Sequence, residues 1–269
     1  MHQDLFDDPV TTELMDNLNY KNCFVYSDTV KEGKIKQPNP VDIVAKICNI
    51  VNSFLPNRKK IAITLGANRA PIDSVRAIQN ASSGKTGWII SEYLYRNGHE
   101  IICIVGKTSV SPSFVLPDIR SAGSPNEMLR KCIDLTSNEI KPDVWIHAAA
   151  VLDYFTEPIN GKRSSGLDDW QITLKQGPKH IQELMPLVGD SIRIGFKLES
   201  NVDENYLIEK SLNQISKYDL DAVIANIKEQ IHDTRFPRAR IVNKDGSVVK
   251  LIDYKELCEA IESVILSSH

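Results

Sequence analysis

The sequence lacks any apolar run long enough to cross a membrane. Its longest uninterrupted apolar stretches cover about five to seven residues, whereas a membrane-spanning helix needs about 20. The first residues are polar and acidic and include no apolar signal region. We therefore expect neither a membrane partner nor export.

Closely spaced cysteines and an excess of positive charge are also absent. The five cysteines are widely separated, so the chain has neither a zinc knuckle nor a CxxC redox motif. Their odd number and wide spacing suit a reducing compartment, and we expect a cytoplasmic protein. The formal net charge of -3 gives no basic footprint, so we expect no nucleic acid partner.

The glycine-rich loops of common nucleotide sites are missing as well. After the apolar run 61–65, which suits a buried strand, only Gly66 matches the first glycine of the Gly-x-Gly-x-x-Gly fingerprint. Residues 83–86 resemble the end of a P-loop, but Gln79 stands where that motif needs a glycine. The sequence therefore contains neither an ordinary nicotinamide site nor a P-loop.

From residue 60 onward, apolar strand-like runs alternate with segments of helical spacing. This is the pattern of a parallel sheet covered by helices on both faces. We expect an α/β, Rossmann-like three-layer fold with a mainly parallel sheet, extended by a β-hairpin at residues 240–252 and a closing helix at 254–267. A polar connection near residues 56–60 divides the chain into an N-terminal appendage, 1–57, and a main domain, 58–269.

The polar stretch at residues 66–87 joins the first strand to the first helix and carries more functional groups than a plain connection needs. An acid, a base and an amide are followed by two serines and a glycine at the start of the helix: Asp73, Arg76, Asn80, Ser82, Ser83 and Gly84. Free backbone amides and the positive end of the helix dipole bind anions at such a start. The stretch therefore predicts an anion site.

A second motif, residues 147–154, follows the strand expected at 144–146. Its three consecutive alanines would let a ligand approach the backbone at the carboxyl end of a central strand, where open α/β sheets bind ligands. Taken alone, an alanine run is more often a helix-packing feature. His147 alone is as consistent with a buried strand residue as with a nucleotide contact.

Two lysines lie on the helix expected at about residues 204–217. Lys210 and Lys217 are seven residues apart, so they share one helix face within roughly 20° and could hold a triphosphate. The same helix contains Tyr206-x-x-x-Lys210, as in short-chain dehydrogenases. Those enzymes also need a glycine-rich first turn, which is missing, and a serine near the position of Arg193.

The loop at residues 66–87 resembles the phosphopantothenate–cysteine ligase family of coenzyme A biosynthesis. That family has Gly-Gly-Thr-x-Glu-Pro-Ile-Asp-x-Val-Arg-x-Ile-x-Asn-x-Ser-Ser-Gly-x-x-Gly after its first strand. The residues retained are Gly66, Pro71, Ile72, Asp73, Val75, Arg76, Ile78, Asn80, Ser82, Ser83, Gly84 and Gly87. Ala67, Asn68 and Ala70 depart from the pattern. The family's Ala-Ala-Val-x-Asp-Tyr motif matches residues 149–154.

The resemblance implies a ligase that joins 4'-phosphopantothenate to L-cysteine through an acyl-nucleotide, with a nucleoside triphosphate as co-substrate and Mg²⁺ carried by the triphosphate. Animal members prefer ATP, whereas bacterial and archaeal members prefer CTP. The N-terminal segment looks archaeal and favours CTP.

The resemblance also implies roles for particular residues. Asn80 and Lys162 would act in catalysis, Asn80 by hydrogen bonding to the acyl group and Lys162 on a strap that closes over the triphosphate. Arg76, Asn80, Ala150 and Asn226 would bind substrate. The nucleotide would be bound by Gly66, Ala67, Asn68, Ser82, Ser83, Gly84, His147, Ala148, Ala149, Asp153, Lys162, Pro178, Lys179, His180, Ile181, Phe196, Lys210 and Lys217. No side chains are expected to bind metal.

The N-terminal appendage resembles the C-terminal end of the flavin-dependent phosphopantothenoylcysteine decarboxylase that is often fused in front of the ligase. Met1-His2, Asp8-Pro9 and residues 32–36 carry this likeness. About fifty residues cannot build a flavin site, so we expect no flavin and no decarboxylation.

Three further expectations remain open. A homodimer is expected, because relatives pair through strand extensions near residues 171–174, where Ile172 and Leu174 would otherwise expose an apolar edge strand. The alternatives to the ligase are a nicotinamide oxidoreductase on the same fold and a catalytically silent nucleotide-binding module. The departures at Ala67, Asn68 and Ala70 favour the silent module.

Overall fold

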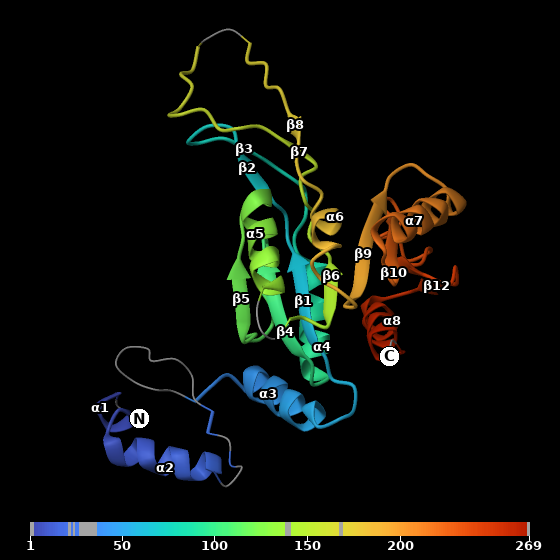
Figure 1. Ribbon diagram of the computed structural model, residues 1–269. Coiled ribbons are helices and arrows are strands. Elements are labelled where there is room, and N and C mark those ends of the chain that lie inside the picture. Colours follow the sequence, from blue (N-terminus) through green and yellow to red (C-terminus); the bar gives the residue numbers. More distant parts are fainter. Residues whose placement is uncertain are drawn as a thin grey trace.

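An eight-stranded sheet with the order β12-β11-β10-β9-β6-β1-β4-β5 forms the centre of the protein (Figure 1). Its strands are β1 (Lys60–Leu65), β4 (Glu100–Val105), β5 (Asp118–Ser121), β6 (Val144–His147), β9 (Ile192–Glu199), β10 (Ala222–Ile227), β11 (Ala239–Asn243) and β12 (Val248–Leu251). The computed structural model describes residues 3–20, 23, 25–26, 37–137, 141–166 and 169–267.

The strands from β5 to β10 pair in parallel, whereas β11 and β12 run antiparallel to their neighbours. Numbered along the chain, the parallel strands have the 3-2-1-4-5-6 order of a doubly wound sheet. The predicted fold class is confirmed, including the C-terminal hairpin. β5 was not predicted, because its alternating half-buried and exposed residues give no apolar run at this edge of the sheet.

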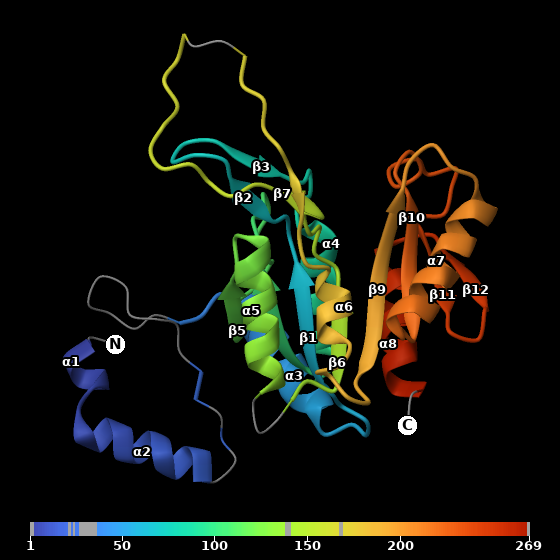
Figure 2. The same ribbon diagram turned by 45° about the horizontal axis from the view of Figure 1, so that its top comes forward.

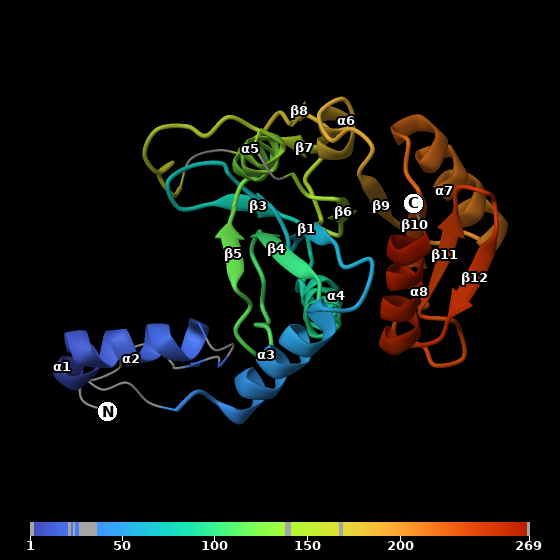
Figure 3. The same ribbon diagram turned by 60° about the horizontal axis from the view of Figure 1, so that its bottom comes forward.

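Helices cover both faces of the sheet (Figure 3). One face packs against α4 (Lys85–Arg96) and α8 (Tyr254–Ser267). The other face packs against α5 (Pro125–Thr136), α6 (His180–Leu184) and α7 (Glu204–Tyr218). The predicted start of α5 is confirmed: Ser124 is the N-cap, its side chain accepts a hydrogen bond from Glu127 N, and Pro125 follows it.

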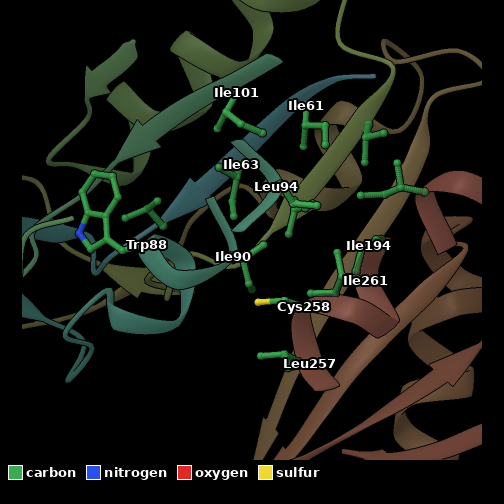
Figure 4. Packing of buried hydrophobic residues seen from close by; sticks show 14 of the residues in the cluster. Ile61, Ile63, Trp88, Ile90, Leu94, Ile101, Ile194, Leu257, Cys258 and Ile261 are labelled. Carbon is green, nitrogen blue, oxygen red and sulfur yellow. The ribbon is translucent and has the colours of Figure 1, made fainter. Parts of the chain in front are cut away.

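The alternation of side chains along β1 explains how one strand serves both layers. Ile61 and Ile63 point toward α4 and α8, where they meet Ile90 and Cys258 (Figure 4). Ala62 points to the opposite face and packs in the cluster under α5. Because both faces are covered, the strand reads as a continuous apolar run, which is why it was recognisable in the sequence.

The N-terminal segment contains α1 (Gln3–Phe6), α2 (Pro9–Tyr20) and α3 (Pro40–Ser53). α1 and α2 lie apart from the sheet, whereas α3 lies against the main body (Figures 1 and 3). Asn49 Nδ2 donates to Tyr95 O at 2.8 Å, and Asn52 Nδ2 donates to Arg96 O at 2.7 Å. α3 thereby satisfies carbonyl groups at the end of α4, which a helix leaves without internal partners. Residues 1–2 and 27–36, which carry part of the decarboxylase likeness, lie outside the described residues.

Two arms rise from the carboxyl ends of the parallel strands (Figure 2). The first is an antiparallel hairpin of β2 (Arg69–Pro71) and β3 (Ala77–Gln79), where the sequence suggested only a long loop. The second is the strap, of which the structure describes residues 156–166 and 169–174, between β7 (Tyr154–Phe155) and β8 (Lys175–Gln176). The strand expected at residues 171–175 is wrong except at its end: only Lys175 lies in a strand, because the pairing of β8 with β7 begins there.

Among the described ranges, no helix has both the length and the apolar character that a membrane span requires.

Candidate functional site

Three backbone segments meet just beyond the carboxyl end of β1. Ala67 N donates to Lys107 O at 2.9 Å, and Asn68 N donates to Ala150 O at 3.1 Å. Gly66 turns the chain with a φ of +81°, and a Cβ on it would lie 2.9 Å from Lys107 O. This close approach explains the need for glycine at residue 66, while the neighbouring position accepts Ala67, whose side chain is fully buried.

Asn80 joins the two sequence motifs. Its Nδ2 lies 3.2 Å from Ala150 O and 3.0 Å from Val151 O, at the end of β6. Two carbonyl oxygens on one side of an amide require its NH₂ group there, so this contact fixes the orientation of the side chain. The amide oxygen of Asn80 is therefore directed away from these carbonyls and can accept a hydrogen bond from a ligand.

The start of α4 has the features of an anion site. Gly84 is the N-cap with a left-handed backbone, and as a glycine it has no side chain to accept a hydrogen bond from the first amides of the helix. The nearby hydroxyls approach only loosely: Ser82 Oγ lies 3.4 Å from Gly84 N, and Ser83 Oγ lies 3.3 Å from Lys85 N. Weak internal partners leave the first amides of this 12-residue helix available to an anion.

The predicted nucleotide residues after β6 and before α6 lie together. Lys179 Nζ is 3.6 Å from Asp153 Oδ1, and Gly177 N donates to Asp153 O at 2.9 Å. Ala148 and Ala149 are half-buried on opposite faces of the sheet. The structure thus brings residues 147–153 next to residues 177–181.

Two histidines in this region are held in their neutral form. Burial, followed by the charge of Arg193 and the neighbouring His180, lowers the pKa of His147 to about 3. Burial also lowers the pKa of His180 to about 4, although Pro125 and Asp153 act in the opposite direction. The Nε2 atom of His147 is buried without a hydrogen-bond partner among the described residues. Neutral imidazoles can both donate and accept, so they suit an uncharged ligand group.

The tip of the β2–β3 hairpin holds the strap. The Asp73 carboxylate accepts hydrogen bonds from Arg76 N at 2.6 Å and Arg163 N at 3.3 Å, and it pairs with Arg76 Nη1 at 2.5 Å. Burial raises the pKa of Asp73, but these hydrogen bonds outweigh it and lower the pKa to about 2. The guanidinium groups of Arg76 and Arg163 lie 5.3 and 5.1 Å from the Trp170 ring centre. Trp170 was missed as an anchor because no neighbouring sequence pattern marks it.

Lys162 lies on this strap between two residues that contact the hairpin. Gly161 O accepts from Ser74 N at 3.1 Å, and Arg163 N donates to Asp73. The Lys162 side chain is exposed and forms no ion pair within the described residues. The structure therefore places it beside the hairpin tip.

The remaining predicted residues are more scattered. Gly195 pairs with His147 in the β6–β9 ladder. Phe196 follows Gly195 and so lies beside the motif of residues 147–154. Asn226 is half-buried on β10, one strand further away. Lys210 lies 5.0 Å from the Tyr206 ring, in the middle of α7. Ile181 is a core residue that packs with α7, and Pro178 is half-buried in the turn before it.

Lys217 does not join the other residues. It belongs to the last turn of α7, beside Tyr218, whose carbonyl accepts a hydrogen bond from Arg193 near the start of β9. Parallel strands joined by a helix make that helix run back to their amino ends. Lys217 therefore lies at the opposite edge of the sheet from Gly66 and Asn80, because sharing a helix face with Lys210 does not place both lysines at one end.

The described part of the chain shows neither a metal-binding cluster nor a thiol with a lowered pKa. No group of three or more His, Cys, Asp or Glu side chains there could hold a metal ion. Burial raises the pKa values of Cys103, Cys132 and Cys258 to about 12, so these thiols stay protonated. The site offers positioning groups and anion contacts instead of a nucleophile.

Comparison with protein families matches residues 57–267 to the DNA/pantothenate metabolism flavoprotein C-terminal domain. Curated relatives include the coenzyme A biosynthesis bifunctional protein CoaBC of Methanocaldococcus jannaschii, 33% identical over 230 residues, which cover 84% of this chain and 55% of that protein. CoaBC of Thermococcus kodakarensis is 30% identical over 229 residues, with the same shares covered. The chain spans about half the length of these relatives.

Solved structures of related proteins have the same fold as this chain. The DNA/pantothenate metabolism flavoprotein from Streptococcus pneumoniae is 27% identical, with a TM-score of 0.67 over 78% of this chain and 100% of that one. The C-terminal domain of CoaBC is 26% identical, with a TM-score of 0.59 over 80% and 96% of the two chains. A Cab2 mutant solved with phosphopantothenate-cysteine is 20% identical, with a TM-score of 0.60 over 85% of this chain and 93% of that one, and shares the fold. With its sheet order, its joined motifs and these matches, the chain belongs to the family of the DNA/pantothenate metabolism flavoprotein C-terminal domain.

Proposed function

We propose that this protein joins 4'-phosphopantothenate to L-cysteine in coenzyme A biosynthesis, using a nucleoside triphosphate. The observation that carries the proposal is the Asn80 side chain, which donates to Ala150 O and Val151 O and so joins the two ligase-like motifs at one edge of the sheet. The family membership and the names of the relatives, which are proteins of coenzyme A biosynthesis, support it.

The first step activates the carboxylate of the acid substrate. A carboxylate oxygen attacks the α-phosphorus, the bond to the β-phosphate oxygen breaks, and pyrophosphate leaves with that electron pair. Negative charge moves toward pyrophosphate, so amides at the start of α4 and the ammonium group of Lys162 are suited to stabilise the change. No protein nucleophile takes part, which agrees with the positioning groups found in the site.

The second step forms the amide. The cysteine amine attacks the acyl carbon, the C–O bond to the nucleotide phosphate breaks, and the proton lost by nitrogen passes to the departing nucleotide monophosphate. Asn80 presents its amide oxygen to the site, because its NH₂ group is taken up by Ala150 and Val151. The resemblance implied that Asn80 hydrogen-bonds the acyl group, but its NH₂ group already has two acceptors. Its oxygen suits an N–H of the attacking amine instead, so Asn80 is proposed to orient the nucleophile.

CTP is the proposed nucleotide, with ATP as the alternative. We assign the base and ribose of the nucleotide to His147, Ala148, Ala149, Asp153 and Lys179, of which Lys179 Nζ lies 3.6 Å from Asp153 Oδ1. The side chains of the described residues form no cluster that fits Mg²⁺ as a sole set of ligands, so the ion would be held mainly by triphosphate oxygens and water. The reaction involves no change in oxidation state and needs no flavin, although the family is named after a flavoprotein.

A catalytically silent nucleotide-binding module is the competing function. Asn68 favours it, because its side chain is fully buried and its Oδ1 atom has no hydrogen-bond partner in the described residues, where the ligase pattern has a threonine. A silent module would bind nucleotide but release no pyrophosphate.

The deciding experiment measures pyrophosphate release with CTP and ATP side by side. The protein, 4'-phosphopantothenate, L-cysteine and Mg²⁺ are present in both reactions, and omission of each substrate is the control. We expect pyrophosphate release that depends on 4'-phosphopantothenate, with CTP faster than ATP. Nucleotide binding without pyrophosphate from either triphosphate would establish the silent module.

Three accompanying proposals concern the whole protein. The chain acts in the cytoplasm, as a homodimer, and residues 1–57 form an appendage of decarboxylase origin that lies on a ligase domain of residues 58–269. The contacts of α3 with the end of α4 support the docking of the appendage. Light scattering that gives about 60 kDa, twice the 30.2 kDa chain, would agree with the dimer.

A further inference from the structure

Arg238 is a half-buried cation that lies beside the first turn of α4. It directly precedes β11, in which Arg240 pairs with Ala225 near the end of β10, so Arg238 stands at the carboxyl edge of the parallel strands. Its Nη2 donates to Thr86 Oγ1 at 3.3 Å, and Thr86 is the second residue of α4. Sequence reasoning missed Arg238, because a single arginine in a loop carries no pattern.

The ring of Tyr254, the first residue of α8, orients this guanidinium group. Arg238 Cζ lies 3.5 Å from the ring centre, close enough for the planar group to stack on the ring. Lys85 Nζ is 5.7 Å from the same ring centre, so one aromatic side chain joins the two cations. Because stacking already orders Arg238, a ligand has less side-chain freedom to remove.

Arg238 uses little of its hydrogen-bonding capacity within the described residues. Its side chain forms two hydrogen bonds there, and both are long: the one with Thr86, and one from Nη1 to Ile231 O at 3.4 Å. Burial lowers the pKa of Arg238, and the groups that oppose this shift are Tyr254 and Cys258 instead of a carboxylate. Most of its five N–H groups are therefore available to an anion.

The two aspartates of the neighbouring loops are engaged elsewhere. Asp233 Oδ2 pairs with Arg235 Nη2 at 2.6 Å, and Asp253 Oδ1 accepts from Glu256 N at 2.9 Å at the start of α8. Arg238 is thus a cation that no carboxylate of the described ranges neutralises.

Cations at the start of a helix are unfavourable by themselves, because the helix dipole places partial positive charge at that end. Lys85 is the first residue of α4, Arg238 contacts the second, and the first turn contains no acidic residue. An anion with several charges removes this repulsion. The cluster therefore favours a polyphosphate over a single carboxylate.

We propose that Arg238 is a catalytic residue that binds the leaving pyrophosphate group, with Lys85 beside it. The inference rests on the proposed function, in which amides at the start of α4 meet the triphosphate. As the bond from the α-phosphorus to the bridging oxygen breaks, the electron pair passes to pyrophosphate. A planar guanidinium can hold two pyrophosphate oxygens at once, so its contact strengthens as this charge arrives.

The experiment compares Arg238→Gln and Arg238→Lys with the unmodified protein. Calorimetry with Mg²⁺ gives the dissociation constants of pyrophosphate, CTP, CMP and 4'-phosphopantothenate, and single-turnover pyrophosphate release gives the rate. Arg238→Gln should weaken pyrophosphate and CTP roughly tenfold and slow release roughly a hundredfold, since the lost contact counts most in the transition state. Arg238→Lys should restore part of the rate, because it keeps the charge and loses the fork. CMP, which lacks the outer phosphates, should bind as before.

Arg235→Gln is the matched control, because Arg235 is an exposed arginine of the same loop, and it should behave like the unmodified protein. Unchanged pyrophosphate binding by Arg238→Gln overturns the proposal, as does an equal loss of affinity for CMP. A loss confined to 4'-phosphopantothenate assigns the arginine to the acid substrate and also overturns it. Pyrophosphate binding that depends on Arg238, in a protein that releases none from CTP, keeps this site and loses the ligase function.

Discussion

Two polar clusters in this protein differ in how completely their hydrogen bonds are satisfied. At the amino ends of the strands, Glu262 of α8 accepts hydrogen bonds from Arg58, His99, Tyr93 and Asn97 at 3.0 to 3.3 Å. Lys59 N donates to His99 Nδ1 at 3.1 Å, which assigns the ring proton to the Nε2 atom that faces Glu262. This cluster leaves no oxygen of Glu262 for a ligand.

The cluster at the carboxyl ends leaves polar atoms open instead. His147 Nε2 and Asn68 Oδ1 are buried without partners in the described part of the chain, and the oxygen of Asn80 is turned away from its backbone partners. Buried polar atoms without partners among the described residues also occur at the amino edge, on Arg96 and Arg193, but those at the carboxyl edge belong to the two sequence motifs. Unsatisfied buried groups cost stability, so atoms of this kind within the motifs indicate a region that a ligand completes. The saturated edge holds the fold together, and the open edge is suited to binding.

Glu262→Ala, which removes the acceptor of the saturated cluster, should have the largest effect of the variants below. The change leaves Arg58 and His99 without their acceptor in a largely buried place, and it should lower the free energy of unfolding by about 3–5 kcal/mol. Urea denaturation gives the value. Pyrophosphate release per folded molecule should stay within about twofold, because the cluster lies at the opposite edge of the sheet from the proposed substrate site.

Glu262→Gln is the matched control for that change, since it keeps the shape and loses the charge. Burial raises the pKa of Glu262, but hydrogen bonds from His99 and Tyr93 outweigh it, so the pKa is lower in the folded protein. The contribution of ionised Glu262 to the free energy of unfolding is therefore present above the pKa that this group has in the unfolded chain. It is lost as the pH falls through the lower pKa of the folded protein. A loss below about 1 kcal/mol in Glu262→Ala would show that this edge does not stabilise the fold.

Asn80→Asp should have the opposite effect to Glu262→Ala: it should lower the activity and leave the free energy of unfolding nearly unchanged. A carboxylate would face Ala150 O and Val151 O, lose both donated hydrogen bonds and repel the anionic intermediate. We expect the second half-reaction to slow by about 10²–10³ and the first to change less. Single-turnover release of pyrophosphate and of nucleotide monophosphate separates the two steps. Normal turnover would remove Asn80 from its proposed role, and the unfolding free energy checks that the fold is intact.

His180 should make the open edge sensitive to mild acid. Burial lowers its folded pKa to about 4, below the usual 6.5, so the unfolded chain binds more protons in that interval. The free energy of unfolding should therefore fall as the pH drops from 6.5 to 4, by about 2 kcal/mol. His180→Gln should flatten this part of the curve in urea denaturation at several pH values. The same slope in protein and variant would assign the loss to other groups.

Lys162→Ala should give the smallest of these effects. Its ammonium group is proposed to meet phosphate oxygens most strongly as charge moves to pyrophosphate, so chemistry should slow by about tenfold and nucleotide binding should weaken less. Lys162→Arg should restore only part of the rate, because a planar fork does not replace a compact charge.

Lys175→Ala on β8 is the control for Lys162. Single-turnover pyrophosphate release is measured beside equilibrium binding of CTP. If binding falls while the rate at saturation is unchanged, Lys162 is only a docking charge. An equal effect of Lys175→Ala would show that the strap acts through its general charge.

The sequence by itself determined the layers of the fold and the location of the main motifs. Helix and strand periodicities are set locally by backbone geometry, so the runs that became β1, β4 and α8 could be recognised from neighbouring residues alone. The cap of α5 was equally local, because Ser124 and Glu127 are only three residues apart.

Only the tertiary structure decided how those motifs are used. The β2–β3 hairpin, the direction of the Asn80 amide and the contact of Arg238 with Thr86 depend on hydrogen bonds between residues that are not sequence neighbours. Lys217 shows the same limit, since its helix face could be predicted but not its edge of the sheet. Periodicity tells which side of an element is buried, whereas the position of a loop or helix end is fixed by the non-local partners that complete its hydrogen bonds.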